Sequence, residues 1–149
     1  MKFKYLIIIL VVILLLSVIS FIVFPQISNN ENTVNINGTT FHLPEGYYEG
    51  STNYLGNVNI TNGINSIFIS EYNDINIANH IKDYKEFIKK QNQTVIIKEI
   101  KNNNLTIYKA ENQNSSEIVH YFLVKNSKTY DIYTWDGNKN TDKLIFELV

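Results

Sequence analysis

The stretch that decides the fold is Val34–Leu43, VNINGTTFHL. Apolar and polar residues alternate on both sides of Asn37-Gly38, which is typical of two paired strands with one buried face. Asn-Gly adopts the positive φ angles of a two-residue type I′ turn, and such a turn would pair Ile36 with Thr39. The stretch therefore predicts a β-hairpin. Its buried face would carry Val34, Ile36, Phe41 and Leu43, and its exposed face Asn35, Thr40 and His42.

A second hairpin is predicted around Asn62-Gly63. Leu55–Thr61 and Ile64–Ser70 alternate on its two sides, and a two-residue turn would place Val58 opposite Ile67. Two antiparallel pairs of strands are therefore expected before the pattern changes.

The next segment has the pattern of a helix. Apolar side chains recur at intervals of three and four residues, which is the spacing of one face of an α-helix. We expect Asp74 or Asn76 to cap its first turn, because either side chain can accept a hydrogen bond from a free backbone amide. The apolar residues of the predicted helix are Ile77, Ile81, Tyr84 and Ile88.

Four further strands and a short helix complete the predicted fold. Ile118–Val124 is almost entirely apolar, so we expect it at the centre of the sheet, covered on both faces. A last helix should begin near Thr141. The predicted class is α+β, an N-terminal transmembrane helix followed by an antiparallel sheet flanked by helices. The four strands are expected at Thr94–Lys101, Leu105–Ala110, Glu117–Lys125 and Lys128–Trp135.

The order of these elements resembles the PsbP-like family. The first hairpin ends in Phe41, Pro44, Gly46 and Tyr47, which is similar to the family's F-x-x-P-x-G-[WY] element and has one residue fewer before the proline than many members. The resemblance covers residues 33–149 and extends to short, single-pass versions found in archaea. It implies an α/β/α sandwich that acts as a binding or assembly module. Members of the family include extrinsic subunits of photosystem II and relatives that bind a small GTPase.

The apolar run Leu6–Phe24, LIIILVVILLLSVISFIVF, predicts a membrane anchor. It has no charged residue, and as a helix it would be about 28 Å long, close to the ~30 Å apolar core of a bilayer. Lys2 and Lys4 precede it, so the positive-inside rule places the N-terminus in the cytoplasm. The alternative, a cleaved signal peptide, is disfavoured because the run is long and no small-residue cleavage site follows it.

We therefore expect a single-pass protein of the cell membrane. The predicted parts are an anchor at residues 1–24, a stalk at 25–32 and an extracytoplasmic PsbP-like domain at 33–149. The chain has a formal net charge of −1 and contains neither cysteine nor arginine. This composition excludes disulfides, thiol nucleophiles and thiolate metal sites. Without a basic patch or arginine, no nucleic-acid partner is expected.

The sequence has no recognisable catalytic or cofactor motif. The histidines, His42, His80 and His120, lack the spacing of a metal site, and His120 is expected to be a core residue. Oxygen-bearing side chains follow the spacing of an EF-hand loop, but Thr141 stands where that loop requires glycine. We therefore predict no metal, no cofactor and no catalytic site. The residues with this spacing are Asp136, Asn138, Asn140, Asp142 and Glu147.

Five Asn-x-Ser/Thr sequons are candidate glycosylation sites, at Asn37, Asn59, Asn92, Asn104 and Asn114. An equally simple interpretation is that they are Asn-rich turns. The expected function is a membrane-anchored binding or assembly module with a protein partner. One alternative is a structural envelope glycoprotein. Another is a hydrolase-type enzyme that uses His120 or His42.

Overall fold

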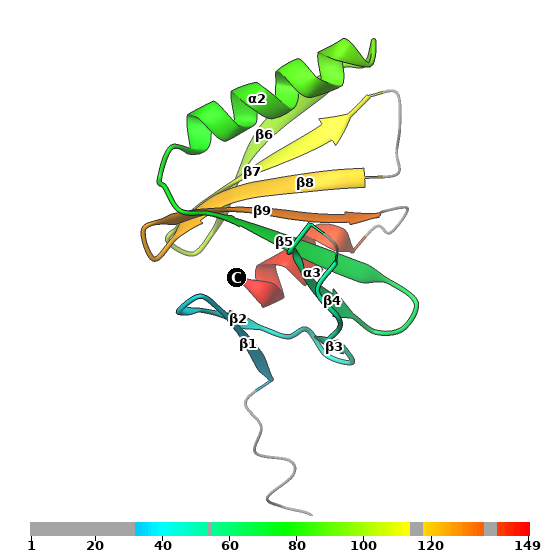
Figure 1. Ribbon diagram of the computed structural model, residues 1–149, viewed down its shortest axis with the longest axis vertical. Helices are drawn as coiled ribbons and strands as arrows, with labels where there is room; N and C mark the ends of the chain where they lie inside the picture. The colour runs from blue at the N-terminus through cyan, green and yellow to red at the C-terminus, as the bar shows by residue number, and fades with distance from the viewer. Residues whose placement is uncertain (1–31, 54, 114–117, 136–139) are drawn as a thin grey trace, which may run out of the picture. The chain divides into compact units, whose positions relative to one another are not determined.

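The computed structural model describes residues 32–53, 55–113, 118–135 and 140–149. These residues belong to one compact unit, Asn32–Val149. Within them the chain forms a two-stranded sheet, a seven-stranded sheet and two helices (Figure 1). Strands account for 49% of the described residues and helices for 20%.

The two-stranded sheet is the predicted hairpin. β1 (Thr33–Ile36) pairs with β2 (Thr39–His42), and Ile36 lies opposite Thr39. Asn37 and Gly38 have φ angles of 47° and 91°, both in the positive range that a type I′ turn requires. Val34, Ile36 and Phe41 are buried and Leu43 packs against the core, whereas Asn35, Thr40 and His42 are exposed. The predicted pairing and faces are confirmed.

The seven-stranded sheet is antiparallel throughout. Its spatial order is β3-β4-β5-β9-β8-β7-β6. β9 therefore occupies the centre, and the prediction that Ile118–Val124 is central is wrong by one strand. That segment is nevertheless an interior strand with buried side chains on both faces. The strands are β3 (Tyr48–Glu49), β4 (Val58–Thr61), β5 (Ser66–Tyr72), β6 (Val95–Asn102), β7 (Leu105–Asn112), β8 (Ile118–Lys125) and β9 (Lys128–Trp135).

The second hairpin, β4–β5, has a different register from the one predicted. Val58 lies opposite Ile69, and Ile67 lies opposite Ile60. The connection has four residues, because the Asn62 side chain accepts hydrogen bonds from the backbone amides of Ile64 and Asn65 at 3.0 and 2.7 Å. A side-chain acceptor of this kind replaces a two-residue turn by a wider one.

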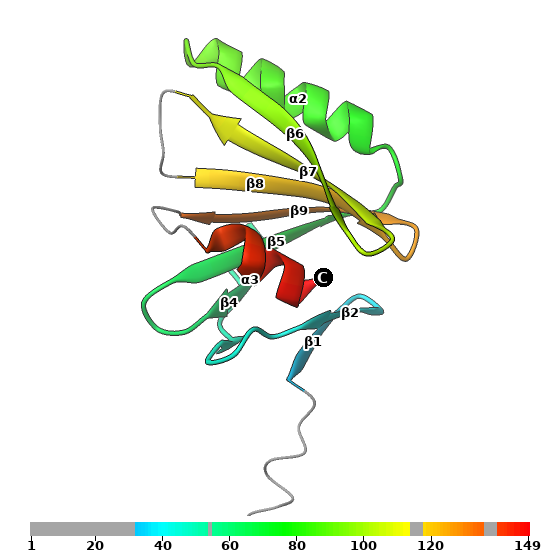
Figure 2. The same ribbon diagram turned by 180° about the vertical axis from the view of Figure 1, so that it is seen from behind.

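The two helices lie on opposite faces of the large sheet (Figures 1 and 2). α2 (Ile77–Lys90) begins after Asn76, whose side chain accepts a hydrogen bond from the backbone of Asn79, so one of the two predicted caps is confirmed. α2 packs against β8. α3 (Thr141–Leu148) begins at the predicted residue and buries Ile145 and Leu148 in the core cluster on the other face.

The predicted fold class is wrong. The described chain is mainly antiparallel sheet, with one helix on each face of the large sheet, and is not an α/β sandwich. Among residues 32–53, 55–113, 118–135 and 140–149, no helix is long and apolar enough to cross a membrane. The longer helix, α2, has only 14 residues, about 21 Å at ~1.5 Å per residue. The predicted anchor at 1–24 lies outside the described residues. The structure does not support the predicted single-pass localisation in the cell membrane.

Glu71 joins the small hairpin to the large sheet. Its carboxylate accepts hydrogen bonds from Asn37 Nδ2 at 3.3 Å, Lys128 Nζ at 2.8 Å and the Tyr130 hydroxyl at 3.2 Å. Lys128 also donates to the backbone oxygen of Asn37 at 3.0 Å. Burial opposes the charge of Glu71, but the hydrogen bonds from Lys128, Asn37 and Tyr130 outweigh it. They hold the pKa of Glu71 below its ordinary value of 4.5.

Glu71→Gln should remove a contribution to stability that depends on pH. Because the native pKa is depressed, the wild-type advantage should be complete above the unfolded value of about 4.5 and should be lost as the pH falls through the native pKa. Urea unfolding over a series of pH values measures this difference. Glu45→Gln, at an exposed position, is the control. If the difference in the free energy of unfolding between the wild type and Glu71→Gln stayed constant down to strongly acidic pH, the pKa of Glu71 would not be depressed by its hydrogen bonds.

Candidate functional site

A row of contacting rings crosses the face of the large sheet on which α2 lies, with stacked contacts from Phe68 through Tyr133 to His120, an edge-on contact of Trp135 with Phe68 and a tilted contact of Tyr84 with His120. The ring centroids are separated by 5.3 Å from Trp135 to Phe68, 5.2 Å from Phe68 to Tyr133, 5.1 Å from Tyr133 to His120 and 4.4 Å from His120 to Tyr84. The register explains the row, because Phe68 of β5 and His120 of β8 both lie opposite Tyr133 of β9. We call these five residues the aromatic row.

The aromatic row runs from solvent to the underside of α2. Trp135 is 55% exposed, whereas the side chain of His120 is only 16% exposed. Phe68 and Tyr133 are half-buried between them. Tyr48, which is 54% exposed, lies on the same face of the sheet because β3 pairs it with Thr61 of β4. Large aromatic side chains therefore reach solvent at this end of the face.

His120 forms a close pair with Asp131. Its Nδ1 lies 2.9 and 3.0 Å from the two carboxylate oxygens of Asp131, whose side chain is 10% exposed. The pair fixes the orientation of the imidazole, and the other ring nitrogen, Nε2, has no hydrogen-bond partner in the part of the chain that the structure describes.

Sequence analysis missed this pair and a second one. His80 of α2 lies 3.0 Å from Asp74 and stacks on Tyr72 at 3.9 Å. A signal for the first pair did exist. The two-residue connection between β8 and β9 places Lys125 opposite Lys128, and that register brings His120 diagonally beside Asp131.

The tyrosines around Asp131 remain protonated at neutral pH. Burial, and then the negative charge of Asp131, raise the pKa of Tyr84 to about 12. The same two causes, in the same order, raise the pKa of Tyr72. These hydroxyls can therefore donate hydrogen bonds but are unsuited to act as bases.

Neutral polar side chains border the aromatic row. Asn57 donates from Nδ2 to the Tyr133 hydroxyl at 2.9 Å. On β4, the side chain of Asn59 lies opposite Phe68, and its Oδ1 is buried without a hydrogen-bond partner. A β-carbon added at Gly50 would lie 2.9 Å from the Asn59 amide nitrogen, so the loop that follows β3 passes close over this residue.

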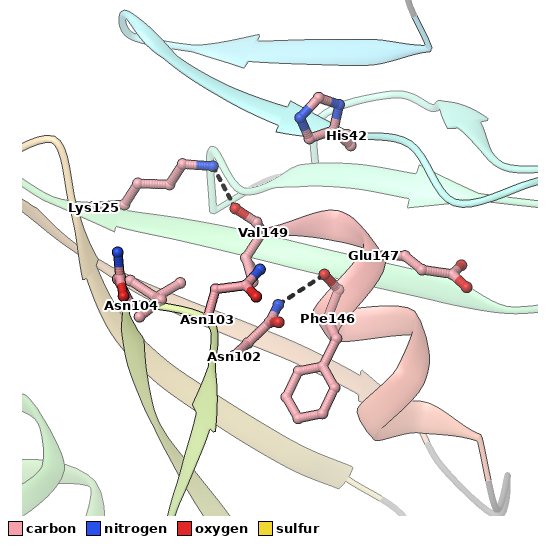
Figure 3. Close-up of a pocket in the computed structure, with 9 residues that line it drawn as sticks. His42, Asn102, Asn103, Asn104, Lys125, Phe146, Glu147 and Val149 are labelled. Atoms are coloured by element: carbon pink, nitrogen blue, oxygen red, sulfur yellow. Dashed lines mark hydrogen bonds between the residues drawn. The ribbon is translucent and has the colours of Figure 1, made fainter.

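A separate pocket of about 470 Å³ lies by the C-terminal end of α3 (Figure 3). Lys125 donates from Nζ to the backbone oxygens of Val149 at 2.7 Å and Thr40 at 2.8 Å, and Asn102 donates to that of Phe146 at 2.9 Å. Burial lowers the pKa of Lys125. These polar groups hold the end of the helix in place. The pocket is lined by His42, Asn102, Asn103, Asn104, Leu105, Lys125, Phe146, Glu147 and Val149.

The predicted sequons fall in different environments. Asn37 and Asn92 are exposed and adopt positive φ angles of 47° and 57° in turns, and Asn104 is exposed in the β6–β7 turn. Asn59 is partly buried within β4. Asn114 lies outside the described residues.

The residues with EF-hand spacing are only partly described. Asp136 and Asn138 lie outside the described part of the chain. Asp142 instead accepts a hydrogen bond from the Tyr121 hydroxyl at 2.7 Å and pairs with Lys109 at 2.9 Å. Glu147 pairs with Lys143 of the same helix. Across the described residues, no group of three or more histidine or carboxylate side chains is placed to hold a metal ion.

No protein-family model matches this chain, and no curated protein is significantly similar to it.

Proposed function

We propose that this protein is a binding module without catalytic activity and that its ligand contacts the aromatic row. The row carries this proposal because it is continuous from Trp135 in solvent to the oriented ring of His120. Exposed tryptophan and tyrosine side chains supply a large contact area at low conformational cost. The resemblance to the PsbP-like family, whose members are mainly binding or assembly modules, supports the same class of function.

An enzyme that uses His120 is the second candidate, because a histidine oriented by a buried carboxylate has the geometry of a general base. Within the described residues, however, Asp131 is the sole hydrogen-bond partner of the ring, so no hydroxyl or amine nucleophile is positioned beside it. Tyr84 and Tyr133 also cover the ring. These contacts favour binding over catalysis.

A screen of small fragments by NMR of the ¹⁵N-labelled full chain tests the proposed site without assuming a ligand. We expect chemical-shift changes to concentrate on the backbone amides of Phe68, Tyr133 and Trp135 and their neighbours. Trp135→Ala should abolish these changes, and Phe87→Ala, which removes an equally exposed ring from α2, should preserve them. Changes confined to the pocket around Lys125, or an absence of hits, would contradict the proposal.

A further inference from the structure

We infer that the ligand of the aromatic row is a neutral saccharide, an inference that rests on the proposed function. The first reason is the stacking surface. Trp135 and Tyr48 are each more than half exposed on one face of the sheet, and the half-buried rings of Phe68 and Tyr133, which stack on each other 18° from parallel, form an apolar border next to Trp135. The C–H groups on one side of a pyranose ring form a flat apolar surface that packs against an aromatic ring.

The second reason is the hydrogen-bonding chemistry of the neighbouring side chains. The strand register places Ser66 and Ser70 on the same face as Phe68 and Tyr133, and the Asn57 amide borders this face at the Tyr133 hydroxyl. Amide and hydroxyl groups can both donate and accept hydrogen bonds, as sugar hydroxyls do. The face thus combines aromatic rings with side chains that can both donate hydrogen bonds to the hydroxyl groups of a ligand and accept hydrogen bonds from them.

The third reason is the lack of charge, which separates saccharides from other ligands. Among the described side chains that point to this face from β3, β4, β5 and β9, Asp131 is the sole carboxylate, no lysine is present, and Asp131 is already paired with His120. A phosphorylated, sulfated or uronic-acid ligand would find no lysine among the described side chains that these four strands direct to this face. A protein partner would lack charged pairs across the contact, which usually provide orientation and specificity.

Trp135 is the one tryptophan in the sequence, so its emission reports on the site directly. The full chain is titrated with neutral hexasaccharides of glucose, mannose or N-acetylglucosamine, and with hexagalacturonate as a charged counterpart. We expect a saturable change in emission with at least one neutral hexasaccharide and none with hexagalacturonate. In calorimetry, Trp135→Ala should weaken that binding by at least about fivefold, the loss expected for one stacked ring. Phe87→Ala should leave it unchanged.

Three results would overturn the inference. The first is that no neutral hexasaccharide binds at millimolar concentration. The second is that hexagalacturonate binds as tightly as the neutral hexasaccharides. The third is that the Trp135 and Phe87 variants lose the same amount of saccharide affinity. Selection of a peptide from a displayed random library that shifts Trp135 emission, together with no saccharide binding, would overturn the saccharide in favour of a peptide ligand. The fragment screen does not use a saccharide. If fragments bind at the aromatic row but no hexasaccharide does, the saccharide inference alone is rejected and the binding site stands. If neither the fragments nor the hexasaccharides bind at the aromatic row, the proposed binding site itself is rejected.

Discussion

Phe41→Ala should lower the free energy of unfolding by roughly 3–5 kcal/mol, as truncations of fully buried phenylalanines do. Phe41 is 0% exposed and packs edge-on against Tyr130 of the central strand, with ring centroids 5.0 Å apart. The Nζ of Lys125 lies 4.8 Å from the centre of its ring. The small hairpin therefore inserts its largest side chain into the core of the large sheet. Its folding should be inseparable from that of the sheet.

Urea unfolding followed by far-ultraviolet circular dichroism measures this loss. His42→Ala is the matched control, because His42 is the next residue on the same strand and points to solvent. We expect a single transition in each protein and almost no change in the control. A loss below about 1 kcal/mol for Phe41→Ala would show that the hairpin does not share the core.

The local elements could be predicted because their signals lie within a few residues of each other. Asn37-Gly38 determines both the turn and the pairing of β1 with β2, and the spacing from Ile77 to Ile88 predicts α2. The boundaries of β6 to β9 follow from alternating residues separated by short Asn-rich turns. In each case the physical cause, a turn geometry or a helical period, is contained in the segment itself.

The pairings between distant segments could not be predicted in this way. β5 joins β9 with Phe68 opposite Tyr133, although the two residues are 65 positions apart in the sequence. That single pairing moves the centre of the sheet to β9 and completes the aromatic row. Sequence periodicity indicates which face of a strand is buried but not which strand lies beside it.

The wrong register of β4–β5 has a local cause. An Asn-Gly pair predicts a two-residue turn, but the Asn62 side chain accepts two backbone amides and widens the connection. The candidate site depends on this register, because it places Asn59 rather than another residue opposite Phe68.

Phe122→Ala should also cost roughly 3–5 kcal/mol, because it opens a cavity between β8 and α2. Phe122 is 1% exposed, and the centre of its ring lies 5.7 Å from that of Tyr84. Ile88 is the one buried residue of α2, and Tyr84 adds ring contacts with Phe122 and His120 of the sheet, so loss of the Phe122 ring removes one of the contacts that hold the helix. We expect the amides of α2 to exchange with solvent faster in the variant than those of α3.

Urea unfolding and hydrogen exchange on the same samples separate the two parts of this prediction. Val124→Ala is the control, because Val124 lies two residues along β8 on the same face but is only partly buried. A loss below about 1 kcal/mol would place Phe122 outside the main core. Equal acceleration of exchange in α2 and α3 would show that the helix does not open separately. Because Tyr84 also covers His120, separate opening of α2 would expose the inner end of the aromatic row and would make ligand binding sensitive to the stability of this helix.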